Sequence, residues 1–164
     1  MSTAGQLRPP PVFGEAFGQR LEFDNKPATD TAWYDMPGMT VTLPEAGTYA
    51  VTTEVTGQTA ILPNTSIAIL QRLLVNGAPL TNSDRFVLHT GEAGTGGSST
   101  YTAVRSARTA CHFVTAAAGV IVKVQVQRLA GAVNGAALSP GQPYTGVLGT
   151  GEGGARIEYR KIAD

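Results

Sequence analysis

A run of alternating valines constrains the fold of this chain more than any other feature. In the segment 119–131, GVIVKVQVQRLAG, every second residue from Val120 to Val126 is valine, and the residues between them are mostly polar. Successive side chains of a β-strand point to opposite faces, whereas a helix would spread these valines around its circumference. Valine is also stiff at χ1 and suits a pleated, half-buried surface. The pattern predicts a strand with one apolar face, and that face needs a sheet to pack against.

Short alternating segments separated by Gly and Pro turns fill most of the remaining chain. Strands are expected at 19–24, 39–43, 48–56, 66–75, 84–89, 110–115 and 155–160, with weaker candidates at 100–105 and 144–148. The dipeptide Pro37-Gly38 and the segment 45–47 are interpreted as turns, and 58–64 as a loop. No segment is convincingly helical and no repeat is present. This pattern predicts an all-β, antiparallel jelly-roll β-sandwich of about eight to ten strands.

The segment 66–75, SIAILQRLLV, is apolar on both sides of a strand. Its apolar residues also fit the i, i+3, i+4 spacing of a helix. Asn76-Gly77 follows at once and is a strong hairpin signal, which favours a strand. A strand that is apolar on both sides is buried on both sides, by a second layer of the same chain or by a subunit interface.

Length and composition exclude several classes of protein. The chain has 164 residues, which is the size of one domain. Only 15% of its residues are charged and the formal net charge is +0, which argues against nucleic-acid binding. No apolar run is long enough for a membrane helix, and residues 1–17 lack the apolar core of a secretory signal. The single cysteine, Cys111, is expected to be a small buried hydrophobe. One cysteine cannot form an intramolecular disulfide, so synthesis in a reducing cytosol is expected.

No residue of the chain looks catalytic. The two histidines, His89 and His112, have no evident partners: His112 follows Cys111, and neighbouring strand residues face opposite ways. The Gly-rich segments 90–99 and 146–151 match neither a nucleophile elbow nor a phosphate loop. We expect no enzyme activity, no metal site and no cofactor.

The N-terminal residues are expected to form an extended arm before a single domain at 12–164. Residues 1–11 are mostly polar and end in Pro9, Pro10 and Pro11, which favour extended chain and lack amide donors. The arm is either a frayed terminus or a segment that orders on a partner. Phe13 and Phe17 follow it directly, and with the three prolines they are candidate partner contacts.

Three blocks of the chain resemble C1q/TNF-like jelly-roll domains. They are PGMTVTLPEAGTYAV (37–51), LQRLLVNGAPL (70–80) and FVTAAAGVIVKVQVQ (113–127). Within the first block, the sequence from Pro44 to Tyr49 matches the Pro-x-x-Gly-x-Tyr pattern that opens a strand in such domains. The resemblance extends over about 33–162 and implies a compact homotrimer, with apolar and aromatic residues near the threefold axis. The candidate subunit-interface residues are Leu70, Leu74, Gln125, Gln127 and Tyr159.

The resemblance also implies a role. A jelly roll without a collagen-like stalk is similar to virion proteins of tailed phages, so we expect a trimeric decoration protein that binds the major capsid protein on the outside of the head. A receptor- or glycan-binding fibre tip, recognising a host-surface glycan, is the alternative. In a trimer, Gln125 and Gln127 are expected to lie in a polar seam between subunits. Gln125→Leu is then expected to disturb assembly specificity more than folding.

Overall fold

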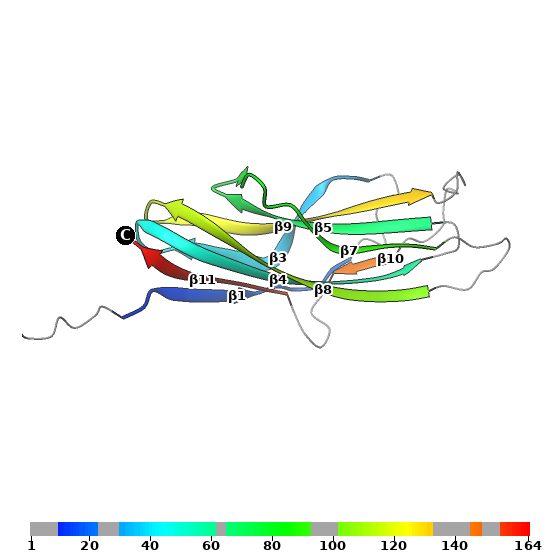
Figure 1. Ribbon diagram of the computed structural model, residues 1–164, viewed down its shortest axis with the longest axis horizontal. Helices are drawn as coiled ribbons and strands as arrows, with labels where there is room; N and C mark the ends of the chain where they lie inside the picture. The colour runs from blue at the N-terminus through cyan, green and yellow to red at the C-terminus, as the bar shows by residue number, and fades with distance from the viewer. Residues whose placement is uncertain (1–9, 23–29, 62–64, 93–101, 133–144, 149–154) are drawn as a thin grey trace, which may run out of the picture.

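The computed structural model describes residues 10–22, 30–61, 65–92, 102–132, 145–148 and 155–164, and these residues form strands and connections with no helix (Figure 1). The strands are β1 (Phe13–Phe17), β2 (Leu21–Glu22), β3 (Trp33–Leu43), β4 (Gly47–Ile61), β5 (Thr65–Val75), β6 (Ala78–Pro79), β7 (Arg85–Glu92), β8 (Thr102–Ala116), β9 (Val120–Ala132), β10 (Thr145–Leu148) and β11 (Arg156–Ala163).

The strands form two antiparallel sheets that face each other (Figure 1). One sheet has the order β1-β11-β4-β8, and the short strands β10 and β2 continue it beside the second half of β4. The other has the order β3-β9-β5-β7, with β6 beside the end of β5. Successive long strands alternate between the two sheets except at β5 and β7, which is the connectivity of a jelly roll. The expected fold class is confirmed.

The alternating valines of β9 lie at the centre of the core. Val122, Val124 and Val126 are 0% exposed, and they lie beside Val75, Leu73 and Gln71 of β5. Strand β9 is hydrogen-bonded on both sides, to β3 and to β5, so its apolar face covers the middle of the opposite sheet. The expected half-buried strand is confirmed.

The segment 66–75 is a strand, and the Asn-Gly pair that follows it forms a hairpin turn. Asn76 and Gly77 have φ angles of 48° and 81° between β5 and β6. A two-residue turn of this kind needs positive φ at both positions, which asparagine tolerates and glycine allows freely. The outward-facing residues Ala68 and Leu74 of β5 are only 8% and 7% exposed within the single chain. Much of the second apolar side is therefore covered without a second subunit.

The expected turn at Pro37-Gly38 is wrong, because β3 runs through it. The pairing of β3 with β9 shifts register between Asp35 and Thr40, and Gly38 has a φ of 78°. This is a β-bulge, in which glycine provides the left-handed conformation. The Gln19 amide donates to the Pro37 carbonyl oxygen at 2.7 Å, so the bulge is joined to the connection after β1. Turn-forming residues specify a local conformation, and here the flanking pairing keeps the strand continuous.

Other strand boundaries also differ from expectation. The first long strand is Phe13–Phe17, paired with β11, whereas of the expected strand at 19–24 only Leu21–Glu22 is a strand and residues 23–24 lie outside the described residues. Residues 58–61, expected in a loop, belong to β4, and one strand, β8, spans most of the two segments expected at 100–105 and 110–115. Strands β4 and β8 pair continuously over their whole lengths. This long-range pairing extends both strands beyond their weak local patterns.

A few polar side chains lie between the sheets. The Thr53 hydroxyl donates to Gln71 Oε1 at 3.1 Å, and Gln71 Nε2 donates to the Arg108 carbonyl oxygen at 3.3 Å. His112 faces the same interior from β8 and is 9% exposed. Burial, and secondarily the positive charge of Arg85, lower the pKa of His112 from its ordinary value of 6.5. The folded state therefore favours the neutral imidazole.

Shortening a central valine should lower stability without changing the fold. Val124→Ala removes two methyl groups from a fully buried site and is expected to reduce the free energy of unfolding by about 2 kcal/mol. The matched control is Lys123→Ala at the neighbouring position, which points outward and should change it by less than about 1 kcal/mol. Urea unfolding measures both values. Equal effects of the two substitutions would contradict the assignment of faces on β9.

The buried histidine predicts a pH dependence of stability. Because the folded pKa of His112 lies below 6.5, the unfolded chain binds the proton more tightly, and the free energy of unfolding should fall as the pH drops through that value. His112→Gln should remove this component of the slope, as measured by urea unfolding from about one pH unit above to about one and a half units below the ordinary histidine pKa. His89→Gln, at the other histidine, is the control. A slope that persists in His112→Gln would contradict the assignment.

Candidate interaction surface

The outer face of the β1-β11-β4-β8 sheet carries a row of aromatic and basic side chains. The register places Phe13 of β1 beside Arg160 of β11, Arg160 beside Ala50 of β4, and Ala50 beside Phe113 of β8. Directly paired residues project from the same face of a sheet. The row therefore crosses four strands and presents a phenyl ring at each end.

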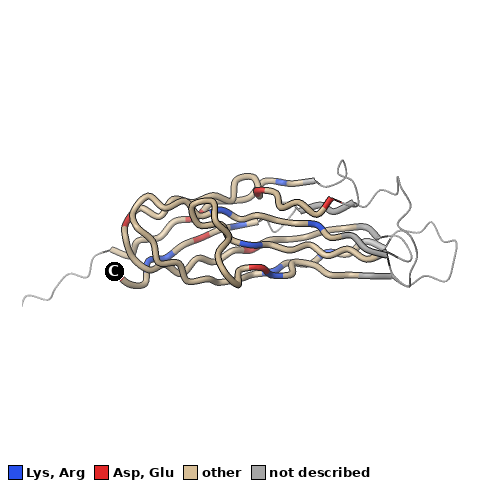
Figure 2. The backbone as a smooth tube through the Cα atoms, turned by 90° about the horizontal axis from the view of Figure 1, so that it is seen from above, with Lys and Arg blue, Asp and Glu red and all other residues tan. Residues whose placement is uncertain are grey.

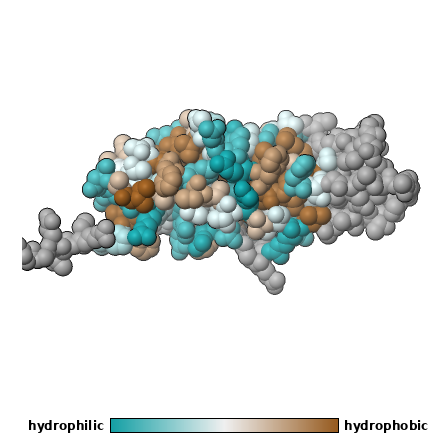
Figure 3. Space-filling model, viewed as in Figure 1, coloured by the Kyte–Doolittle hydropathy of each residue, from teal (hydrophilic) through white to brown (hydrophobic). Residues whose placement is uncertain are grey.

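The aromatic residues of this face are unusually exposed. Phe13, Phe113 and Phe17 have 72%, 69% and 63% of their surface exposed, and Ile162, near the end of β11, has 51%. Single exposed apolar residues are common, but several large ones on one sheet face mark an interaction site. On the side of the molecule seen in Figure 3, apolar patches likewise alternate with hydrophilic ones. The outer face of this sheet is the strongest candidate for contact with a partner.

Charges of both signs lie between these apolar residues. Arg156 Nη1 lies 3.4 Å from Glu158 Oε2 and 3.9 Å from Glu15 Oε2, and Glu15 and Glu158 are register partners. Glu54 pairs with Arg156 on the other side. All four side chains are partly solvated, so the pairs contribute little to stability. Figure 2 shows that acidic and basic residues are interspersed along the strands. A surface with both charges can complement a copy of itself.

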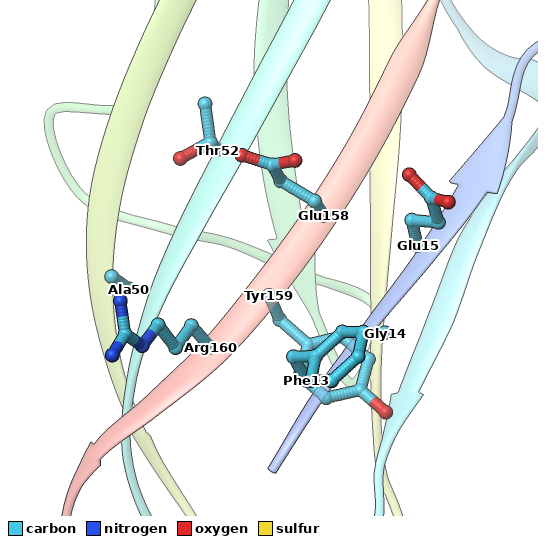
Figure 4. A pocket seen from close by; sticks show the side chains of 8 residues that line it. All are labelled: Phe13, Gly14, Glu15, Ala50, Thr52, Glu158, Tyr159 and Arg160. Carbon is cyan, nitrogen blue, oxygen red and sulfur yellow. The ribbon is translucent and has the colours of Figure 1, made fainter. Parts of the chain in front are cut away.

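A shallow hollow of about 420 Å³ lies in the same face, over β11. Phe13 and Glu15 line it from β1, Glu158 and Arg160 from β11, and Thr52 from β4 (Figure 4). The ring of Tyr159 passes beneath Gly14, where an added Cβ would meet the Tyr159 hydroxyl oxygen at 2.6 Å. Glycine at this position therefore lets β1 lie close to β11. The hollow combines an aromatic wall with charges and suits a side chain of a partner.

Cys111 lies on this outer face, and its expected burial is wrong. It pairs with Thr52 of β4 and is exposed. Its neighbours His112 and Val114 occupy the inward positions of β8. The apolar composition of 110–114 did not reveal which of the alternating positions face the core.

Two candidate interface residues, Gln125 and Gln127, lie on the outer face of the other sheet. Arg72 donates from Nε and Nη2 to Gln125 Oε1 at 3.0 and 2.7 Å, and Gln125 Nε2 donates to Asp35 Oδ1 at 2.8 Å. The bond from Gln125 is the largest cause that lowers the pKa of Asp35 below its usual value; desolvation, the next largest, opposes it, and the bond and charge of Lys123 lower the pKa further. The amide of Gln125 thus binds partners within its own chain, and its place in a subunit seam stays a prediction.

The other candidate residues are distributed over several surfaces. Leu70 is partly exposed and Leu74 is nearly buried, both on the outer side of β5. Tyr159 packs edge-on against Tyr49 with ring centroids 5.7 Å apart, and Tyr49 is fully buried. Pro10 and Pro11 are exposed, and Pro9 lies outside the described residues. The register places Phe13 and Phe17 on the outer face of one sheet, and Gln125 and Gln127 lie on the outer face of the other sheet.

Phe113 and Ile162 were not predicted from the sequence as surface residues. Phe113 lies between the inward residues His112 and Val114 of the same strand, and this alternation was the sequence signal that it faces outward. Nothing in the sequence near Ile162 shows that β11 shifts register between Lys161 and Ala163. Aromatic residues in the phase opposite to the core are therefore the best sequence marker of this surface.

The described residues contain no cluster of three or more His, Cys, Asp or Glu side chains arranged for a metal ion. His112 faces the interior, whereas His89 is exposed and stacks on Phe86 with ring centroids 5.5 Å apart. The two histidines thus belong to different environments. A search of the same described part of the chain finds no helix suited to crossing a membrane.

Comparison with known proteins gives a similarity of fold. The sequence matches no protein-family model and no curated protein. Among solved structures, the chain is similar to Eiger TNF from S. frugiperda, with 15% sequence identity, coverage of 94% of each chain and a TM-score of 0.43. A similarity at this level carries no information on function. The jelly-roll assignment rests on the strand order of the chain itself.

Proposed function

We propose that this chain is a non-enzymatic structural protein of a virion, a homotrimer that binds the major capsid protein on the outside of a phage head and reinforces it. The observation that carries the proposal is the exposed aromatic row on the β1-β11-β4-β8 sheet, where Phe13 and Phe113 are 72% and 69% exposed. The phage context rests on the resemblance of the sequence to free-standing jelly-roll virion proteins.

The partner proposed for the aromatic face is a second copy of the chain. The face carries basic residues, Arg156 and Arg160, together with acidic residues, Glu15, Glu54 and Glu158. A copy of the same face can offer each of these charges a counterpart while the phenyl rings are buried. In a threefold ring each copy contacts its neighbours through two different parts of its surface, so the Phe13 end of the row on one copy would meet the Phe113 end of the row on the next. This assignment differs from the interface expected around Gln125 and Gln127.

Capsid binding is assigned to the N-terminal end of the domain. Strand β1 begins at Phe13, beside Arg160, and Lys161 donates its amide to the Val12 carbonyl oxygen at 2.8 Å. The preceding residues therefore leave the domain next to the proposed assembly face. Binding to assembled capsid subunits, and not to free ones, would stabilise the shell by mass action. The arm itself, residues 1–9, lies outside the described residues.

A receptor- or glycan-binding tip remains the second candidate, and one observation favours it. Ile61 pairs with Thr102, and Thr65 pairs with both Glu92 and Ala132, so the strand ends that flank 93–101 and 133–144 lie at one end of the sandwich. The connecting segments themselves lie outside the described residues. This end is opposite the end where β1 begins, and in a capsid-bound trimer it would point away from the capsid.

Placing a charge in the aromatic row should prevent assembly. Phe113→Asp puts a carboxylate where the proposed interface buries a phenyl ring, and the mass in solution should fall from that of a trimer to that of one chain. Phe86→Asp is the matched control on the other sheet, where the ring is 57% exposed, and should remain trimeric. A wild-type chain that sediments as a monomer would overturn the trimer.

Removing the arm should separate capsid binding from assembly. A chain lacking residues 1–11 keeps every described strand and is expected to remain trimeric while its binding to purified capsids weakens by at least about tenfold. Co-sedimentation with capsids measures the binding, and mass in solution serves as the control for assembly. Undiminished binding by the truncated chain would contradict the role of the arm.

A further inference from the structure

The phenyl ring of Phe113 projects from an otherwise low part of the outer sheet face. It is 69% exposed, and the next outward residues of β8 on either side, Cys111 and Thr115, are small. Its register partner on β4, Ala50, is small as well. A large apolar ring among small neighbours gains most when a concave surface covers it.

The hollow over β11 is a concave surface of suitable size on the same face. Its volume is about 420 Å³, whereas a closed apolar cavity of about 150 Å³ already holds a benzene molecule. Phe13 offers the edge or face of a second ring, and the Arg160 side chain offers a cation to the face of an entering ring. Phe113 of the same chain does not line the hollow, because Ala50 lies between them. The ring that fits this hollow comes from another copy.

We propose that in the trimer put forward above, Phe113 of each copy occupies the hollow over β11 of the next copy. This inference rests on the proposed function, because it needs the trimer. It adds which residue enters which site, and it predicts which residues of neighbouring copies lie opposite each other.

Two more rows of register partners cross the face beside the aromatic row. Directly paired residues lie at the same position along the strands, so each row is level from β1 to β8. The second row is Glu15, Glu158, Thr52 and Cys111, and the third is Phe17, Arg156, Glu54 and Thr109.

A threefold axis parallel to the strands brings the ring and the hollow to the same level. The strands run along the length of the described sandwich, so copies around such an axis meet along their long sides (Figure 1). A rotation about this axis leaves the position of each residue along the strands unchanged. Phe113 and Arg160 belong to one row, so Phe113 of one copy reaches the hollow of the next without a shift. Cys111 of one copy then lies level with Glu158 of the next.

The charges of the face are compatible with this contact. Near Phe113, the outward residues Cys111 and Thr109 of β8 carry no formal charge. Glu158 on the other side of the contact therefore meets no like charge, and it keeps Arg156 of its own chain, 3.4 Å away, as a counter-ion. The contact buries a ring without opposing two charges of one sign.

The native cysteine allows a direct test by disulfide formation. Glu158→Cys places a second thiol level with Cys111, and within one chain β4 separates the two by about 10 Å, too far for a disulfide. Between copies the two thiols are expected to meet. Oxidation of the full-length variant with oxidised glutathione should therefore give covalent dimers and trimers, seen on a non-reducing gel, at least about tenfold faster than in Arg156→Cys.

Arg156→Cys is the matched control because it lies on the same strand and face. The two native side chains are equally exposed, at 41%, and position 156 lies one row away, roughly 7 Å along the strand. Adding Cys111→Ser to Glu158→Cys should abolish the covalent products. Equal rates at 156 and 158, or products that persist without Cys111, would overturn the inference.

Filling the hollow provides a second test. Ala50→Trp occupies the space proposed for Phe113 of the next copy, and the protein concentration at which the trimer dissociates should rise at least about tenfold. Thr40→Trp, at an exposed position of the other sheet, is the control and should leave that concentration unchanged.

The outcomes separate this inference from the proposed function. A wild-type chain that sediments as a monomer would overturn both. A wild-type trimer in which Glu158→Cys does not link to Cys111 and Ala50→Trp still assembles normally would overturn the placement of Phe113 and leave the trimer standing.

Discussion

The burial of one apolar side from each of two sheets is the constraint on which the rest of this structure depends. Strand β9 shows it most directly, because Val122, Val124 and Val126 are fully enclosed and their neighbours in sequence all face outward. Each strand has a period of two, so a shift of one residue would exchange every inward and outward side chain. The core thereby determines the position of every residue on the two outer faces.

The two outer faces can differ in chemistry because the packing of the core does not restrict which residue types they carry. One carries phenylalanines with charges of both signs between them. The other carries a network in which Trp33, Arg72, Gln125 and Asp35 hold one another in place. Exposed apolar surface suits burial against a partner subunit.

The resemblance to C1q/TNF-like domains correctly indicated the sheet architecture, but the candidate interface residues lie on different surfaces. Gln125 is bonded within its own chain, Tyr159 packs on Tyr49, and Leu74 is covered by the chain itself. Phe13 and Phe17, selected as aromatic residues that follow the prolines, are on the exposed aromatic face. Exposed aromatic residues in the phase opposite to the core were thus better markers of a surface than residues in strongly patterned strands.

The sequence by itself determined the all-β class, the inward valines of β9 and the turn at Asn76-Gly77, because periodicity and positive φ are local properties. Tertiary structure decided the rest. The Pro37-Gly38 pair became a bulge because β3 pairs with β9 on both sides of it, and β4 continued through residues 58–61 because β8 pairs with it there. The aromatic row across four strands depends on register between segments far apart in the chain, and no local pattern encodes that register.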